Sequence, residues 1–356
     1  MTSQRVLLLH AYSARNAGDG LLVDHSVDVI RSAYPGASID ILASHPESFG
    51  GRFDDPLVRV LDFSWASRRR FSSDIGVVKA TTYDAVVGVG GGYLRSGTPS
   101  ETLKALIVHL PQLRFASRRG NHTVYLPQSM GPFRFGTRGI WRRYLRRVST
   151  IYLRDDRSVD ELAISSSRRS PDLAALNIGR RDSTPGVAAL PVMSIREVHG
   201  AVPPTVLELA AKVGSYDAYI QSYGSGNDDV GATSLLMPQS IVTPEQFLDD
   251  QQVPRVVVAV RLHAALMALA AGHYVIHLAY ERKGFGAFDD LGIREYVHNV
   301  NSFSAIEVER QVTALLHHDD VRRDYDRAIV AAIPQFAATR SEITRSLIAP
   351  VRGPQE

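Results

Sequence analysis

A buried strand followed directly by a buried helix is encoded in residues 256–272, which read VVVAVRLHAALMALAAG. The first five residues are all apolar and mostly β-branched, which is typical of a strand covered on both faces. The apolar residues that follow run on to Gly272, a residue suited to ending a helix. This unit therefore predicts a parallel sheet with helices on both of its faces.

The same alternation of strand-like and helix-like segments repeats along the chain. In the first half the strand-like runs are Val6–Leu9, Ser38–Leu42, Val58–Leu61, Ala85–Val89, Thr123–Leu126 and Thr150–Leu153. In the second half they are Tyr216–Gln221, Ser234–Met237, Val256–Val260 and Tyr274–Leu278. The pattern predicts an α/β protein with two Rossmann-like, doubly wound domains that face a cleft.

The length of 356 residues also suits two domains. The β pattern weakens in the Ser- and Arg-rich stretch that begins at Ser165, and such a composition favours loops. We therefore predict an N-terminal domain over residues 1–165, a linker over 166–190, a C-terminal domain over 191–330, and a C-terminal helix and tail over 331–356.

Composition narrows the class of function. Forty basic and 37 acidic side chains leave a net charge of only +3, so we expect no nucleic-acid partner. The absence of cysteine excludes a disulfide framework and thiolate metal sites. The apolar run Val6–Leu9 is shorter than the core of a secretory signal, and no apolar stretch reaches the ~20 residues of a membrane span. We expect a cytoplasmic protein.

Three loops that follow strands carry glycine or polar residues. Their glycines allow a ligand or another part of the backbone to approach closely, and their polar side chains can bind hydroxyl groups. Asp19 is suited to capping the helix that follows it. Each loop also fits an ordinary turn, and the loop at Gly90–Gly92 has the spacing of neither a dinucleotide fingerprint nor a P-loop. The residues singled out are Asn16, Gly18, Asp19, Gly91, Gly92, Gln128 and Ser129.

Arg261 and His263 stand where the buried strand meets its helix. Burying both is costly unless they have partners. Together with the amides at the helix start they predict an anion site with a titratable group beside it. Lys283 follows the next strand, so we expect it at the same sheet edge. A structural ion pair between Arg261 and a carboxylate is the alternative.

Arg154 ends a strand in the first half and predicts a second contact to an anion. Asp155 or Asp156 is the neighbour that would neutralise it in a purely structural role.

Nine arginines and no acidic residue lie between Arg114 and Arg147. The segment from Arg138 to Arg147 mixes arginines with Ile140, Trp141 and Tyr144, which allows peripheral contact with an anionic membrane. A solvated helix face is the simpler interpretation.

In their order along the chain, these motifs resemble the polysaccharide pyruvyltransferase family, whose architecture is similar to that of two-domain GT-B glycosyltransferases. The resemblance is weakest between residues 165 and 253. An acidic residue that usually follows Gly-Asp in the family is Gly20 here. The matching motifs are Asn16-Ala17-Gly18-Asp19, Gly90-Gly91-Gly92, Pro127–Pro132, Arg154-Asp155 with Ser158, Arg261-Leu262-His263, and Tyr280 with Lys283-Gly284.

The resemblance implies transfer of the pyruvyl group of phosphoenolpyruvate to two hydroxyls of a saccharide, which forms a cyclic ketal and releases phosphate. Such a reaction belongs to polysaccharide or cell-envelope glycan biosynthesis. Arg154, Arg261 and Lys283 would balance the negative charge of the donor, since arginine binds carboxylate and phosphate oxygens bidentately. Leu262 would lie in the donor site, and His263 would be the general acid or base.

The resemblance also implies an acceptor on the N-terminal domain and the donor on the C-terminal domain. We expect no cofactor other than phosphoenolpyruvate as co-substrate, and no metal, because no cluster of ligands has metal-binding spacing. A lipid-linked acceptor would place the protein at the inner face of the membrane. Two alternatives stay open: a GT-B glycosyltransferase that uses a nucleotide-sugar, and a non-catalytic protein that binds anionic saccharides.

Overall fold

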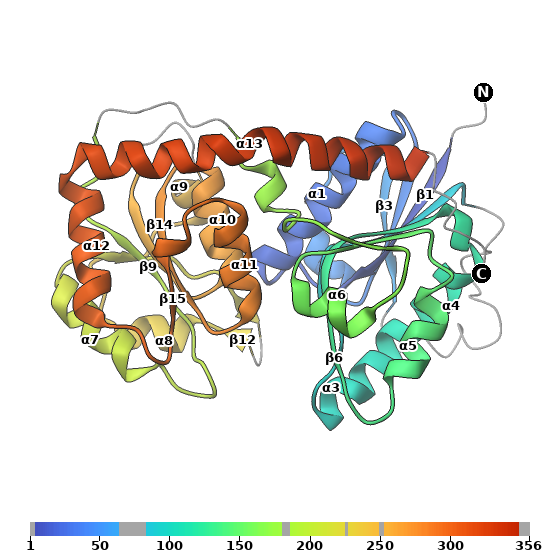
Figure 1. The fold of residues 1–356 in the computed structure, drawn as a ribbon, viewed down its shortest axis with the longest axis horizontal. Helices are drawn as coiled ribbons and strands as arrows, with labels where there is room; N and C mark the ends of the chain where they lie inside the picture. The colour runs from blue at the N-terminus through green and yellow to red at the C-terminus, as the bar shows by residue number, and fades with distance from the viewer. Residues whose placement is uncertain (1–3, 64–82, 180–185, 225–226, 249–252, 349–356) are drawn as a thin grey trace. The chain divides into compact units, whose positions relative to one another are not determined.

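The computed structural model describes residues 4–63, 83–179, 186–224, 227–248 and 253–348 (Figure 1). The chain divides into two compact units. Unit 1 comprises Met1–Ala14, Asp19–Leu173 and Ala338–Glu356, and unit 2 comprises Arg15–Gly18 and Ala174–Ala337. Each unit contains its own parallel sheet, so the predicted α/β class is confirmed.

Unit 1 is built on an eight-stranded sheet in the order β3-β2-β1-β4-β6-β7-β8, with β5 paired to β6. Every pair in it is parallel. Its strands are β1 (Arg5–Ala11), β2 (Ser38–Ala43), β3 (Val58–Asp62), β4 (Ala85–Gly88), β5 (Gly91–Ser96), β6 (Thr123–Phe133), β7 (Thr150–Leu153) and β8 (Ser167–Arg169). Its α-helices are α1 (Ala17–Ala33), α3 (Pro99–Lys104), α4 (Leu110–Arg118), α5 (Arg138–Leu145) and α6 (Asp156–Leu162).

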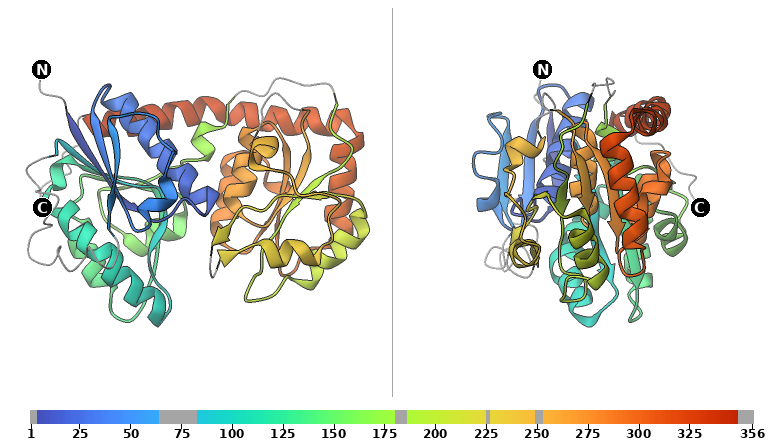
Figure 2. Two further views of the ribbon diagram at one scale, coloured as in Figure 1. Left: turned by 180° about the vertical axis from the view of Figure 1, so that it is seen from behind. Right: turned by 90° about the vertical axis from the view of Figure 1, so that its left-hand side faces the viewer.

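Unit 2 contains a five-stranded parallel sheet in the order β10-β9-β13-β14-β15. Helices flank this sheet, and α7 lies beside α12 (Figure 2). The strands are β9 (Val192–Ser194), β10 (Asp217–Ala218), β13 (Val256–Ala259), β14 (Tyr274–Ala279) and β15 (Val297–Asn299), with a short antiparallel pair of β11 (Tyr223–Gly224) and β12 (Asn227–Asp228). The helices are α7 (Pro204–Val213), α8 (Val230–Leu235), α9 (Pro244–Leu248), α10 (Leu262–Ala270), α11 (Arg282–Asp290), α12 (Ala305–His317) and α13 (Asp319–Ile348).

The apolar runs become the cores of the two sheets. Val6 to Leu9 and Val256 to Val260 are all at most 1% exposed. Burying a valine or leucine side chain fully contributes roughly 1.5–3 kcal/mol, so continuous apolar strands are stable only under helices on both faces. Trp141 of α5 is also fully buried, and its indole N–H donates to the Ser96 hydroxyl at 3.2 Å.

The strand predicted at Ser234–Met237 is wrong. Helix α8 ends at Leu235, and the following residues form a turn. Leu235 and Met237 are 63% and 86% exposed, and only Leu236 between them is buried, at 5% exposure, so this short apolar run is not part of a sheet.

The structure also divides the chain at different places from those predicted. Ser167–Arg169 form β8 and extend the sheet of unit 1, so the predicted linker over 166–190 begins inside that sheet. The units divide between Leu173 and Ala174. The C-terminal helix α13 begins at Asp319 instead of residue 331, and it contributes residues to both units. Residues 349–356 of the predicted tail lie outside the described residues.

Candidate active site

In unit 2, polar side chains follow three neighbouring strands. β13 pairs with β9 on one side and with β14 on the other, and all three run parallel. Their carboxyl ends therefore lie at one edge of the sheet, the usual place for a ligand in an α/β sheet. The residues that follow these strands and form what we call the unit 2 edge are Arg196, Arg261, His263, Tyr280 and Lys283.

Arg261 is buried and forms an ion pair with Asp229. Its Nε donates to Oδ2 of Asp229 and its Nη2 donates to Oδ1, both at 2.6 Å. Arg261 is 6% exposed and Asp229 only 1%. Burial raises the pKa of Asp229, and the hydrogen bonds and positive charge of Arg261 oppose that rise. The alternative of a structural ion pair is thus present, with a partner that sequence analysis missed because it lies 32 positions away.

His263 lies on the first turn of α10 and is half-buried. A Cβ atom at Gly18 would lie 2.5 Å from Cβ of His263 and 2.6 Å from its Nδ1, so only glycine fits there without displacing the imidazole. The backbone N–H of Ala17 donates to the carbonyl of Gln221 at 3.3 Å. The structure therefore brings the Asn16–Gly18 loop and His263 together within unit 2.

The expected capping role of Asp19 is corrected. Helix α1 begins at Ala17, so Asp19 lies inside its first turn. The side-chain oxygen of Asn16 accepts a hydrogen bond from the Gly18 N–H at 3.0 Å, which is the bond that a capping residue makes.

Lys283 lies in the first turn of α11, with its Nζ 2.8 Å from Oε2 of Glu281. Beneath it, the buried His277 donates from Nδ1 to the Ala259 carbonyl at 2.8 Å. Burial lowers the pKa of His277 to about 4, and the positive charge of Lys283 adds to the lowering. His277 is therefore neutral at pH 7. A Cβ at Gly284 would lie 2.4 Å from Nε2 of His277, so this glycine makes room for the ring.

Arg154 belongs to unit 1 and is also buried in an ion pair. Its Nη1 bonds to Asp172, and its Nε donates to the Ser129 hydroxyl at 2.9 Å. Asp155 has a different role: it accepts a hydrogen bond from the Ser158 N–H at 2.9 Å and so caps α6. The partner of Arg154 is therefore not the neighbouring aspartate that the sequence suggested.

Packing explains the glycine loop of unit 1. A Cβ at Gly90 would lie 2.9 Å from the Pro127 carbonyl oxygen, and Gly91 has a φ of +144° that favours glycine. A Cβ at Gly92 would lie 3.4 Å from Nη2 of Arg154. Gln128 has no exposed surface, so it does not present its amide to a ligand in this conformation.

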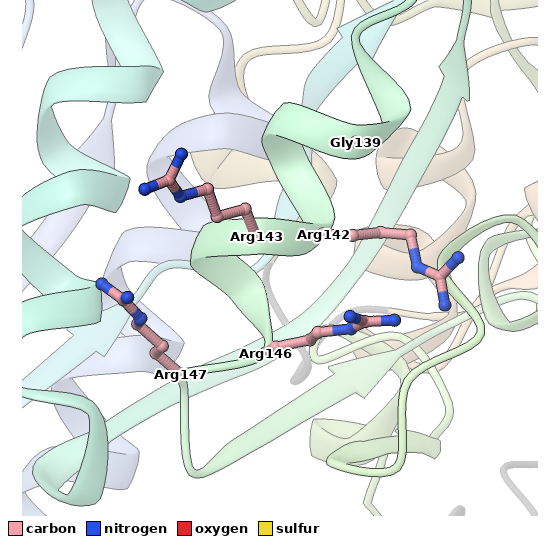
Figure 3. A pocket seen from close by; sticks show the side chains of 5 residues that line it. All are labelled: Gly139, Arg142, Arg143, Arg146 and Arg147. Atoms are coloured by element: carbon pink, nitrogen blue, oxygen red, sulfur yellow. The ribbon is translucent and has the colours of Figure 1, made fainter.

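The arginine segment lines a hollow of about 400 Å³ on unit 1 (Figure 3). Its walls are Gly139, Arg142, Arg143, Arg146 and Arg147. Arg143 and Arg147 point to one side of the helix, and Arg142 and Arg146 point to the other. Arg142 donates to the Ala163 carbonyl at 2.9 Å, at the end of α6. Within the described part of the chain, none of the four arginines forms an ion pair.

The three cations predicted to balance the donor's charge each have a carboxylate partner. The pairs are Arg154 with Asp172, Arg261 with Asp229, and Lys283 with Glu281. These residues are therefore positioned by ion pairs, and they add less net positive charge than the sequence suggested.

Two parallel α/β units with polar loops after their strands define a protein of the GT-B fold, and solved structures agree. One is described as "Trehalose-6-phosphate from E. coli bound with UDP-2-fluoro glucose"; its TM-score is 0.57 at 10% identity, over 98% of this chain and 100% of that one. Another is a putative UDP-N-acetylglucosamine 2-epimerase from Listeria monocytogenes, with a TM-score of 0.56 at 11% identity, over 100% of this chain and 99% of that one. At these identities the likeness shows the fold alone.

Residues 16–282 match the family model described as Polysaccharide pyruvyl transferase. The chain belongs to the polysaccharide pyruvyl transferase family, a family of transferases. The match includes the Asn16–Gly18 loop, Arg154 and the unit 2 edge as far as Tyr280, and it ends one residue before Lys283. No curated protein matches the chain.

Proposed function

We propose that this protein transfers the pyruvyl group of phosphoenolpyruvate to two hydroxyls of a saccharide, forming a cyclic ketal and releasing phosphate. The family match supports pyruvyl transfer to a polysaccharide. The observation that carries the finer proposal is the position of His263, at the start of α10 next to the buried Arg261. The Arg261 guanidinium and the amides at the helix start suit the anionic groups of the donor. The imidazole of His263 places a titratable group beside them.

The donor carries a carboxylate and a phosphate, about three negative charges at neutral pH. Two hydrogen bonds to Asp229 fix the plane of the Arg261 guanidinium. An arginine has five N–H donors in a rigid fork, so a fixed plane also directs its remaining hydrogen bonds. In this proposal Arg261, Leu262 and Lys283 bind the donor, and Arg154 stays a predicted donor contact.

The chemistry needs a proton delivered to the methylene carbon of the donor. One sugar hydroxyl then forms a bond to C2 and loses its proton, the C–O bond to phosphate breaks, and the second hydroxyl closes the ring with loss of its own proton. His263 is the proposed general acid or base for one of these transfers, a role that typically contributes 10²- to 10⁴-fold to the rate.

Because Gly18 lies against His263, we assign the acceptor to the side of the Asn16–Gly18 loop. Asp19, Gly91, Gly92 and Ser129 stay predicted acceptor contacts.

We also propose that the arginine hollow contacts an anionic membrane that carries a lipid-linked acceptor. Ile140 and Phe135, near the arginines in sequence, are 40% and 61% exposed, and such a mixture of basic and apolar side chains suits a lipid surface. No helix in the described part of the chain is long and apolar enough to span a membrane.

Vesicle binding tests this contact with a charge-matched control. Sedimentation with anionic, but not zwitterionic, phospholipid vesicles should be lost in Arg143→Ala/Arg147→Ala. It should persist in Arg310→Ala/Arg323→Ala, which removes the same charge from exposed positions of unit 2. Equal losses of vesicle binding in both double variants would show that only the overall positive charge matters, and would refute the proposal.

Thermal unfolding with phosphoenolpyruvate, and separately with nucleotide-sugars, tests the donor. Ligand that binds the native state raises the melting temperature by mass action. We expect a rise with phosphoenolpyruvate alone. A rise only with a nucleotide-sugar would instead support a GT-B glycosyltransferase, the alternative that agrees with the fold of the solved structures.

Phosphate release from phosphoenolpyruvate, measured with a panel of saccharide acceptors, tests the chemistry. His263→Ala should abolish turnover and leave donor binding largely intact, whereas Arg261→Ala should weaken donor binding. Unchanged turnover in His263→Ala would remove His263 from the mechanism. Saccharide binding that survives this substitution and weakens steeply with salt, without any turnover, would point to a non-catalytic binding protein.

A further inference from the structure

Arg196 is a cation of the unit 2 edge that the sequence motifs did not single out. It follows β9 by two residues and is half-buried. Its Nη1 donates to the Tyr280 hydroxyl at 3.1 Å, and its guanidinium carbon lies 5.1 Å from the centre of the Tyr280 ring. A third contact runs from its Nε to the Glu197 carbonyl at 2.9 Å.

Through its contacts with Tyr280, the Arg196 side chain spans the end of the central strand β13. Arg196 follows β9 and Tyr280 follows β14, and β13 lies between these two strands in the sheet. β13 is the strand that leads directly into Arg261 and α10. In agreement, the positive charge of Arg196 opposes the rise in the pKa of Asp229 that burial causes, so Arg196 lies within electrostatic reach of the Arg261–Asp229 pair.

Arg196 differs from the other two cations of the edge in its partners. Arg261 is paired with Asp229 and Lys283 with Glu281. Across the described residues, no carboxylate lies within ion-pair distance of Arg196, and its hydrogen bonds go to a phenol and a carbonyl. These three cations and two paired carboxylates leave one positive charge, and Arg196 supplies it.

We propose that Arg196 binds the carboxylate or phosphate of the phosphoenolpyruvate donor and that Tyr280 positions its guanidinium for this contact. The proposal rests on the proposed function above. A half-buried arginine without a carboxylate partner offers a charge-assisted, bidentate contact to either anionic group. The phenol hydroxyl and the ring of Tyr280 hold the guanidinium in place without neutralising it.

Donor affinity in matched variants tests this role. Hydrogen bonds to charged groups contribute about 1.5–3 kcal/mol, so Arg196→Ala should weaken phosphoenolpyruvate binding by roughly 10- to 150-fold in calorimetry. Arg196→Lys keeps the charge but loses the planar fork and should recover only part of the affinity. Tyr280→Phe keeps the ring and loses the hydroxyl, and should give a smaller loss. Arg310→Ala removes an exposed arginine of α12 and should bind like the wild type.

The kinetic pattern separates donor binding from a structural role. In phosphate-release assays, Arg196→Ala should raise the KM for phosphoenolpyruvate, leave the KM for the acceptor unchanged, and keep a wild-type melting temperature without ligand. If the wild type does not bind phosphoenolpyruvate, the proposed function fails and this inference with it. If the wild type binds and Arg196→Ala or, should that variant not fold, Arg196→Lys binds equally well, the inference alone is overturned.

Discussion

Replacing Asp229 by leucine should destabilise the protein strongly, because it leaves the Arg261 guanidinium buried without its carboxylate. The two side chains are both buried and share two hydrogen bonds of 2.6 Å. Breaking a buried ion pair from one side costs about 3–5 kcal/mol. For a folding unit of roughly 150–250 residues, each kcal/mol lowers the melting temperature by about 2–4 °C. We therefore expect a fall of about 6–20 °C.

Calorimetry on four proteins measures this: the wild type, Asp229→Leu, Arg261→Met and the double variant. Removing both partners eliminates the unpaired charge, so the double variant should be more stable than Asp229→Leu alone. An exposed pair of the same unit, Arg294 with Asp289, is the control, and Asp289→Leu should change stability far less than Asp229→Leu, because solvent screens an exposed pair.

Additive effects of the two single substitutions would refute this reasoning, since contacting residues must show a coupling energy. An Asp229→Leu variant that melts no lower than Asp289→Leu would refute it as well.

Three further predictions concern unit 2 and the reaction. Gly18→Ala should displace His263 and lower phosphate release, at a stability cost of about 1–3 kcal/mol. Gly231→Ala is the control, because a Cβ there meets nothing within 4 Å and should change neither activity nor stability. Equal activities of the two variants would contradict the contact between Gly18 and His263. Burial lowers the pKa of His277 in the folded protein to about 4, below the usual 6.5 of the unfolded chain. The neutral His277 therefore contributes about 3 kcal/mol to the free energy of unfolding above pH 6.5, and this stability is lost as the pH falls toward 4. Melting curves across that range should show this loss, and His277→Asn should flatten it; an unchanged slope in the variant would assign the loss to other groups. Phosphate release should persist after dialysis against a chelator, and recovery only on adding a divalent cation would overturn the expected metal independence.

The fold could be predicted from the sequence because each sheet contains strands that are continuous apolar runs in the sequence. Val6–Leu9 and Val256–Val260 became buried strands almost at the predicted bounds. The strand prediction at Ser234–Met237 failed because three consecutive apolar residues show neither a helical nor a strand periodicity. The exposure of Leu235 and Met237, which the sequence does not reveal, distinguishes this helix end from a strand. β9 was missed since its three residues are too few to give a pattern.

The candidate site was predictable in its cations but not in their partners. Arg261, His263 and Lys283 follow adjacent strands, so strand pairing alone places them at one edge. Asp229 lies 32 residues before Arg261, and Asp172 lies 18 after Arg154. No local spacing connects such pairs, because tertiary packing decides which carboxylate meets which guanidinium. The adjacent Asp155 was the expected carboxylate partner of Arg154, but its side chain caps helix α6 instead.

The division of the chain into units affects the order in which the protein can fold during synthesis. Unit 1 includes residues after 337, so its last part emerges only after all of unit 2 has been made. Those residues matter to it: Ile343 and Leu347 are buried, and the Tyr34 hydroxyl donates to the Leu347 carbonyl at 2.5 Å. Domains usually fold in order from the N-terminus as they are translated. The first unit to leave the ribosome is therefore complete only when the last residues of the chain have been made, and a fragment that ends at residue 173 would lack the buried Ile343 and Leu347.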